Sequence, residues 1–106
     1  MILVVDDEPS VTRALELILN ESGFEVLTAH SFAQSIKVLC HANVDLVITE
    51  LRLSDATGID LITHIKRETP DTEVILLTAF GSARNQRSKP SSAGAYYYLE
   101  KPLRLT

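Results

Sequence analysis

Short apolar runs that alternate with amphipathic stretches constrain the fold of this chain more than any other feature of its sequence. The apolar runs are 2–5, 24–28, 46–49, 74–77 and 95–99, and the amphipathic stretches are 9–22, 31–39 and 59–65. A short apolar run is typical of a strand buried on both faces, whereas apolar residues three and four positions apart are typical of a helix packed on a sheet. This order predicts an α/β fold with a doubly wound, five-stranded parallel sheet, in which right-handed crossovers place helices on both faces.

The ends of the predicted helices carry recognisable signals. Pro9 suits the first turn of the first helix, and Gly23 suits the position after its last residue. Ser31, followed three positions later by Gln34, resembles a capping box that opens the second helix. The third helix is expected to end before Pro70, because the residue before a proline is driven out of the helical conformation.

The size and composition of the chain limit the kinds of protein it can be. With 106 residues, 45% of them hydrophobic, it is expected to form a single domain over residues 1–106. Its net charge of −4 offers no basic stripe for direct nucleic-acid binding. No apolar run approaches the roughly 20 residues that span a membrane. The single Cys40 excludes an internal disulfide, the early acidic residues argue against a signal peptide, and we expect a cytoplasmic protein.

Polar residues follow the apolar runs at the points where the predicted strands end. Asp6 and Asp7 follow the first strand, Glu50 the third, Thr78 the fourth and Lys101 the fifth. Each alone would pass as a solvated loop or turn residue, but the carboxyl ends of parallel strands meet at one edge of a sheet. Three carboxylates there would repel one another unless a cation neutralised them, and oxygen ligands favour Mg²⁺. With a lysine and a hydroxyl added, the edge is suited to holding a phosphoryl group.

One stretch departs from the alternation. Residues 81–92 read GSARNQRSKPSS, with almost no apolar residue and with Pro90 inside. A helix there would have no apolar face to bury, so the stretch is expected to be irregular, short or mobile.

Four segments, taken in order, resemble the receiver domain of two-component response regulators. They are LVVDDEP, DLVITELRLSDATGIDLI, VILLTAFGS and GAYYYLEKP. The resemblance covers the chain apart from the polar stretch, which stands in place of the family's fourth helix, and it implies the flavodoxin-like receiver fold. The wording around TAFGS and YLEKPL is most similar to receivers of enhancer-binding transcription activators.

The resemblance implies a magnesium site and a set of partners. Asp7 would bind Mg²⁺ directly, Asp6 would act mostly through water, and the backbone carbonyl of Arg52 would be a further ligand. The implied partners are a sensor histidine kinase, an output domain outside this chain that is expected to bind DNA, and a second copy of the chain in a homodimer.

The resemblance also assigns a phosphoryl site. Thr78 and Lys101 would contact the phosphoryl oxygens, and Tyr98 would be the rotating aromatic that reports the active state. The position of the phosphorylated aspartate is held by Glu50, whose extra methylene moves the carboxylate outward by on the order of 1.5 Å. Because a misplacement of about 1 Å can cost about a hundredfold in rate, phosphorylation by a kinase is expected to be inefficient.

A further departure lies at the end of the chain. The sequence stops at Thr106, where the family continues into a fifth helix. We therefore expect the fifth helix to be missing or truncated, which would leave one edge of the sheet's apolar face uncovered. On this interpretation the chain is a fragment, a truncated gene product or a domain completed by another chain.

Three functions are compatible with these residues. The favoured one is a phosphate-independent receiver in which the carboxylate of Glu50 partly imitates the phosphorylated state, and the second is a conventional Mg²⁺-dependent receiver in which Glu50 accepts phosphate. The third is a small flavodoxin-like enzyme or nucleotide-binding domain, but no Gly-rich phosphate loop follows the first strand. His30, His41 and His64 are scattered and are interpreted as surface or helix-flank residues, so we expect a signalling module and no enzyme.

Overall fold

The computed structural model describes residues 1–78 and 97–100, and within them five parallel strands form one sheet in the order β2-β1-β3-β4-β5. The strands are β1 (Ile2–Val5), β2 (Val26–Ala29), β3 (Leu46–Glu50), β4 (Glu73–Thr78) and β5 (Tyr97–Glu100). β2 pairs with β1 on one side, and β3, β4 and β5 follow in order on the other side. This reversal of strand order is the doubly wound, flavodoxin-like topology, and it confirms the predicted fold class.

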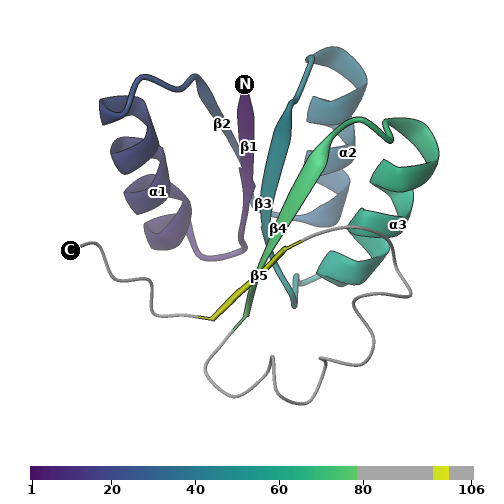
Figure 1. Cartoon of the computed structure of the whole chain (residues 1–106). Coiled ribbons are helices and arrows are strands. Elements are labelled where there is room, and N and C mark those ends of the chain that lie inside the picture. Colours follow the sequence, from purple (N-terminus) through teal and green to yellow (C-terminus); the bar gives the residue numbers. More distant parts are fainter. Residues whose placement is uncertain (79–96, 101–106) are drawn as a thin grey trace.

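Three helices connect the first four strands. They are α1 (Pro9–Glu21), α2 (Phe32–His41) and α3 (Gly58–Glu68). Figure 1 shows α1 on one side of the sheet and α2 and α3 on the other. Each helix joins two parallel strands, which is the arrangement that the alternating sequence pattern predicted.

The helix ends follow most of the predicted signals. Pro9 is the first residue of α1, and Gly23 has a φ of 95°, a left-handed conformation that glycine adopts without a steric cost. The Ser31 hydroxyl accepts the N–H of Gln34 at 3.0 Å, as expected. The Gln34 side chain, however, accepts the N–H of His30 and not that of Ser31, so only half of the capping box forms. α3 ends at Glu68, before Thr69 and the proline.

The second strand is shorter than predicted. The sequence indicated a strand from Phe24, but β2 begins at Val26. The N–H of Phe24 donates to the carbonyl of Leu19 at 3.1 Å, so this residue still belongs to the end of α1. The phenyl ring of Phe24 is exposed, and its apolar character therefore does not mark a buried strand.

The core lies on both faces of the sheet. On the face covered by α2 and α3, the buried apolar residues include Leu3, Val5, Val47, Leu61, Ile62, Ile65, Val74 and Leu76. On the opposite face, a smaller cluster of Ile2, Val4, Ile48 and Leu77 packs against the inner side of α1. The central strand β1 is buried along its whole length, as expected for a strand that continues into the site.

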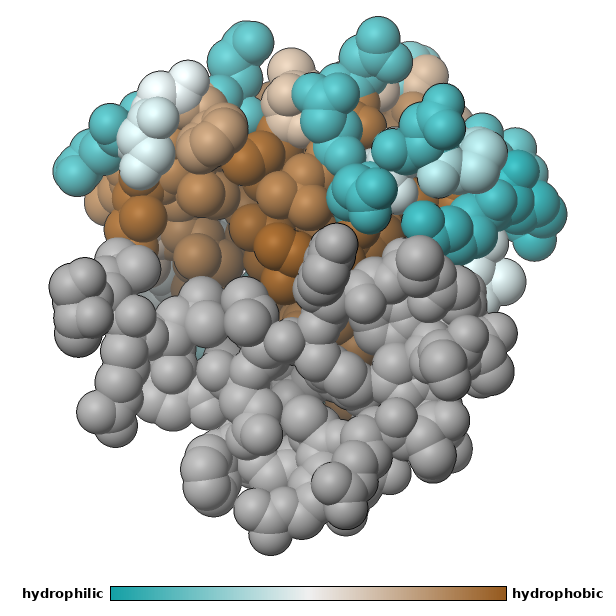
Figure 2. Space-filling model, viewed as in Figure 1, coloured by the Kyte–Doolittle hydropathy of each residue, from teal (hydrophilic) through white to brown (hydrophobic). Residues whose placement is uncertain are grey.

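Of the described helices, only α1 packs on the smaller cluster. Partly buried residues surround it: Leu15, Leu19, Val26, Leu46 and Ile75. Figure 2 shows apolar surface between α1 and the strands, above the residues drawn in grey. The predictions for the polar stretch 81–92 and for a missing fifth helix after Lys101 fall outside the described residues. Within residues 1–78 and 97–100, no helix is long and apolar enough to cross a membrane.

Candidate phosphoryl and metal site at the strand ends

The sheet register brings several of the predicted site residues to one edge. Val5 of β1 lies opposite Thr49 of β3, so Asp6 and Glu50 come next on neighbouring strands. Glu50 lies opposite Leu77, the residue before Thr78, at the end of β4. The edge therefore carries the turn after β1 beside the last residues of β3 and β4, which the predicted site requires.

The two aspartates after β1 have different surroundings. Asp6 is only 1% exposed, and its Oδ1 accepts the N–H of Glu8 at 2.9 Å. Its own N–H donates to the carbonyl of Ala29 at 3.1 Å, which ties the turn to the end of β2. Asp7 is exposed. One carboxylate is thus fixed in the turn, whereas its neighbour is accessible to a ligand from solvent.

Glu50 points toward its own chain neighbour. It is half-buried, and its Oε1 accepts the N–H of Leu51 at 2.8 Å. Among the residues that the structure describes, no group of three or more His, Cys, Asp or Glu side chains is placed to hold a metal ion. The three carboxylates expected to converge therefore do not form such a group within residues 1–78 and 97–100.

The donors present nevertheless fit a magnesium ion in their chemistry. The carboxylates of Asp6 and Asp7 and the peptide carbonyls of the loop after Glu50 are hard oxygen ligands, which Mg²⁺ takes together with several waters. The N–H of Leu51 is shared between Glu50 and the carbonyl of Leu77, both at 2.8 Å. Glu50 therefore does not hold this N–H alone.

The loop between β3 and α3, residues 51–57, is closed by its own backbone. The N–H of Gly58 donates to the carbonyl of Leu51 at 2.7 Å, and the N–H of Leu53 donates to that of Ala56 at 3.0 Å. A Cβ atom on Gly58 would lie 2.6 Å from the carbonyl oxygen of Glu50. The glycine therefore lets the start of α3 pack directly against the end of β3, and it keeps the loop tight around the acceptor position.

Asp55, in this loop, makes contacts that the sequence did not reveal. Its two carboxylate oxygens accept the N–H groups of Phe32 at 2.8 Å and Ala33 at 3.1 Å, the first two residues of α2. These backbone hydrogen bonds hold the pKa of Asp55 below its ordinary value. An aspartate in a polar loop shows no partner in the sequence when that partner lies more than 20 residues away.

A second pair beside the site was also missed. The buried hydroxyl of Thr12 donates to the carbonyl of Pro9 at 3.0 Å and lies 3.1 Å from Nε2 of His30. A hydroxyl has one proton, so while Thr12 donates to Pro9, a hydrogen bond with His30 requires the tautomer that carries the proton on Nε2. The pair joins the first turn of α1 to the loop that leads into α2, and a Thr in a first turn gives only a weak sequence signal for it.

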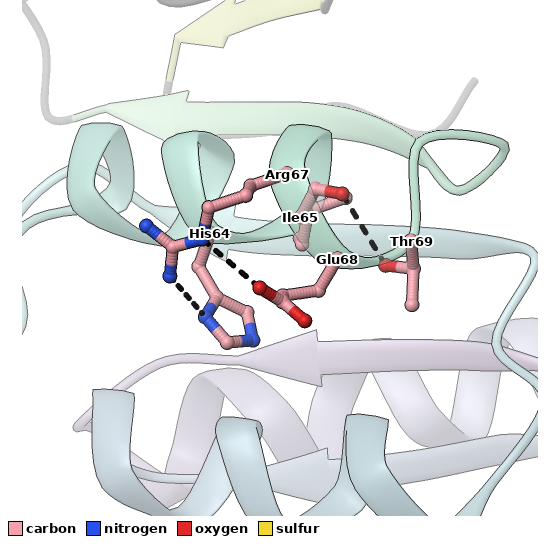
Figure 3. A network of polar contacts seen from close by, with 5 residues as sticks. All are labelled: His64, Ile65, Arg67, Glu68 and Thr69. Carbon is pink, nitrogen blue, oxygen red and sulfur yellow. Dashed lines mark hydrogen bonds and ion pairs between the residues drawn. The ribbon is translucent and has the colours of Figure 1, made fainter.

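The remaining histidines lie on helix flanks, in agreement with the sequence interpretation. His41 is exposed at the end of α2. His64 lies on α3, where its Nδ1 is 3.5 Å from Nη2 of Arg67, and Arg67 in turn pairs with Glu68 at 3.0 Å (Figure 3). The His64 ring also meets the edge of Phe32, with ring centroids 6.4 Å apart.

For Thr78 and Tyr98, the structure describes only the backbone. Thr78 is the last residue of β4, and Tyr98 lies in β5 opposite Leu76. Their side chains and the whole of Lys101 fall outside the described part of the chain. Their expected contacts with a phosphoryl group stay predictions.

Comparison with known proteins identifies the class to which this fold and edge belong. The family model "Response regulator receiver domain" matches residues 2–106, and the chain belongs to this family. The transcriptional regulatory protein GlrR of Escherichia coli is 37% identical over 102 residues, which are 96% of this chain and 23% of GlrR. The response regulator protein PilR of Pseudomonas aeruginosa is 34% identical over 103 residues, 97% of this chain and 23% of PilR. The name of PilR agrees with the resemblance to response regulators, and that of GlrR with an output in transcription regulation.

Solved structures agree with the fold. The receiver domain of NtrX from Brucella abortus matches with a TM-score of 0.89 and 28% identity, covering 98% of this chain and 88% of that one. Response regulator TrrA from Thermotoga maritima, solved in complex with Mg²⁺ and BeF, matches with a TM-score of 0.84 and 33% identity, covering 97% and 87%. The chain spans less than a quarter of the GlrR and PilR chains, so what those whole proteins do extends beyond the part compared.

Proposed function

We propose that this chain is the receiver module of a two-component response regulator that signals without efficient phosphorylation. The observation that carries the proposal is the place of Glu50. It ends β3 beside Asp6, at the edge where the family accepts phosphate, and its carboxylate already holds a hydrogen bond to the loop. The longer acid places its carboxylate at the acceptor position in a different place from that of an aspartate.

The length of the Glu50 side chain explains the proposed loss of phosphorylation. Phosphoryl transfer depends on positioning, because the attacking oxygen, phosphorus and leaving group must lie in line. One methylene displaces the carboxylate by on the order of 1.5 Å. In this chain the displaced carboxylate also accepts the N–H of Leu51 at 2.8 Å.

In the proposed metal site, Asp7 would bind Mg²⁺ directly, Asp6 would act mostly through water, and the Glu50 carboxylate and the Arg52 backbone carbonyl would be further oxygen ligands. The exposure of Asp7 and the burial of Asp6 support this division of roles. When bound, the metal would neutralise charge on the acceptor side of the site. Thr78 and Lys101 complete the proposed phosphoryl contacts, and Tyr98 is the proposed switch aromatic.

The proposed partners follow from the family and from the names of the relatives. A sensor histidine kinase would dock on this module, unless the change at Glu50 has made it dispensable. An output domain that binds DNA would receive the signal, since two of the relatives are named as transcription or response regulators and are over four times longer than the matched region. A homodimer and a cytoplasmic location complete the proposal.

A conventional phospho-receiver is the second candidate. It is favoured by TrrA, a protein 33% identical to this chain, which was solved with Mg²⁺ and BeF bound. In that case the Glu50 carboxylate would leave the Leu51 N–H and accept the phosphoryl group itself.

The decisive experiment compares the unmodified protein with Glu50→Asp. Both are incubated with acetyl phosphate and Mg²⁺, and intact mass spectrometry measures the phosphorylated fraction over time. We expect the Asp variant to be labelled about a hundredfold faster, as a shift of about 1 Å implies. Glu50→Gln is the matched control, because it keeps the length and removes the nucleophile. Equal labelling of the unmodified protein and the Asp variant would reject the phosphate-independent receiver and favour the conventional one.

A further inference from the structure

We infer that Asp55 is a positioning residue that ties the loop 51–57 to the start of α2 and thereby holds the Arg52 carbonyl in place at the sheet edge. The inference rests on the proposed function, because it takes that carbonyl as a metal ligand. Asp55 itself is three residues further along the loop and is exposed, so it is not placed among the ligands.

Asp55 accepts two hydrogen bonds, and both connect the loop 51–57 to α2. Each carboxylate oxygen accepts a different N–H, that of Phe32 and that of Ala33. These N–H groups belong to the first turn of α2, where no helical carbonyl is available to accept them and where the helix dipole favours a negative charge. The geometry fixes the orientation of the carboxylate as well as its position.

The start of α2 has a cap of its own. The Ser31 hydroxyl accepts the third N–H of the helix, that of Gln34, at 3.0 Å. The local cap and Asp55 therefore satisfy different N–H groups. Because Ser31 already marks the beginning of the helix, the added effect of Asp55 falls on the loop that carries it, and α2 serves as the fixed support.

The support is joined to α3 as well. The ring of Phe32 meets the ring of His64 in an edge-to-face contact, at 6.4 Å between centroids. His64 in turn lies 3.5 Å from Arg67 along the same helix (Figure 3). The loop thus begins at β3 and ends at α3. Through His64, α3 contacts Phe32, whose N–H donates to Asp55. A loop fixed at both ends and at its tip presents its carbonyl groups in one orientation, which a metal ligand needs.

Packing of Leu53 is the competing explanation for the order of the loop. This side chain is 9% exposed and belongs to the core on the α2 and α3 face. If Leu53 alone positioned the loop, removal of the Asp55 carboxylate would change only the amides of α2. The two explanations therefore differ in what happens at Leu53 and Gly58 when Asp55 is altered.

The test uses amide NMR of the full chain with Asp55→Ala, Asp55→Asn and the control Asp71→Asn. Asp71 is exposed in the turn before β4, at the opposite end of the sheet. In Asp55→Ala we expect faster hydrogen exchange at the amides of Leu53 and Gly58, together with shifts at Phe32 and Ala33. Asp55→Asn keeps one acceptor oxygen, so its effects are expected to be intermediate. The control should leave these amides unchanged.

Titration of the same samples with Mg²⁺ supplies the second measurement. We expect Asp55→Ala to weaken Mg²⁺ binding about tenfold, the size of effect seen when a group that orients a metal ligand is removed. Unchanged exchange at Leu53 and Gly58 would overturn the inference whether or not Mg²⁺ binds, and so would an unchanged affinity despite faster exchange. An unmodified protein that binds no Mg²⁺ but shows the loop response would reject the proposed metal site and retain Asp55 as the residue that positions the loop.

Discussion

The β1–α1 turn and the β3–α3 loop carry the proposed metal ligands, but they are held in place in different ways. In the turn, the side chains of Asp6 and Thr12 make short-range hydrogen bonds to Glu8 and Pro9, in addition to the longer contacts with Ala29 and His30. The loop is stabilised from outside at its tip, where Asp55 reaches α2 across 22 and 23 residues of sequence.

Short-range contacts can be predicted from a sequence motif, whereas long-range contacts such as those of Asp55 cannot. The contacts in the turn that lie two to three residues apart are encoded in one short segment, and a motif such as DDEP can reveal them. A loop held by another helix depends on the assembled fold. The two halves of one site should therefore respond differently to substitution: local changes should affect the turn, and changes in α2 should affect the loop.

The largest expected effect on stability comes from Gly58, at the base of the loop. In Gly58→Ala the new Cβ would lie 2.6 Å from both the Glu50 carbonyl oxygen and Cδ1 of Leu76. The leucine can move but the backbone of β3 resists, so we expect a loss of about 1–3 kcal/mol in the free energy of unfolding. Urea denaturation measures it. A neutral substitution would show that α3 can move away from the strand end and that the loop is less constrained than the turn.

A smaller effect is expected in the turn region. Thr12→Val removes the buried hydroxyl that donates to Pro9 and lies 3.1 Å from His30 Nε2, so the Pro9 carbonyl and the His30 ring each lose a partner. We expect a loss of about 1 kcal/mol, a typical value for a buried hydrogen bond. Thr63→Val is the matched control, because the Thr63 hydroxyl donates to Ile59 on the exposed side of α3. Equal losses in the two variants would mean that burial of Thr12 adds nothing.

The fold was predictable because the order of apolar and polar residues in the sequence matches the order of buried and exposed residues in the structure. Each residue of β1 is buried, and its apolar run stops where Asp6 begins the turn. The strand boundaries were less predictable. Phe24 looks like a strand residue, but its N–H is used by the end of α1, and that choice depends on how the helix ends.

The placement of Asp6 and Glu50 at one edge of the sheet was predictable, but the contacts of the side chains at this edge were not. The strand ends placed Asp6 and Glu50 at one edge, since the carboxyl ends of parallel strands always meet there. The Glu50 carboxylate accepts the N–H of Leu51, which it shares with the carbonyl of Leu77 on β4, and nothing in the sequence indicates this arrangement. The role of Asp55 was not visible for the same reason, because its partner amides come together with it only in the folded chain.

The smallest expected effect is the pH dependence of the unfolding free energy that comes from Asp55. It tests whether the charge of this residue holds the loop to α2. Hydrogen bonds from the Phe32 and Ala33 amides lower the pKa of Asp55 in the folded protein, whereas the unfolded chain has the ordinary aspartate pKa of about 3.9. The folded state therefore favours the charged carboxylate. Its stabilising contribution is fully present above the ordinary pKa, shrinks as the pH falls below that value, and is lost once the pH passes the lower pKa of the folded state.

The measurement compares the unfolding free energy of the unmodified protein with that of Asp55→Asn at a series of pH values from about 7 down to about 3, a range that spans the ordinary aspartate pKa. We expect the unmodified protein to be the more stable at neutral pH and the difference to fade in acid, because asparagine does not titrate. Asp71→Asn, measured in parallel, removes an exposed carboxylate at the other end of the sheet and corrects for the change in net charge. A difference that stays constant across the series would mean that the charge of Asp55 does not hold the loop to α2, and that the loop, like the turn, is stabilised from within.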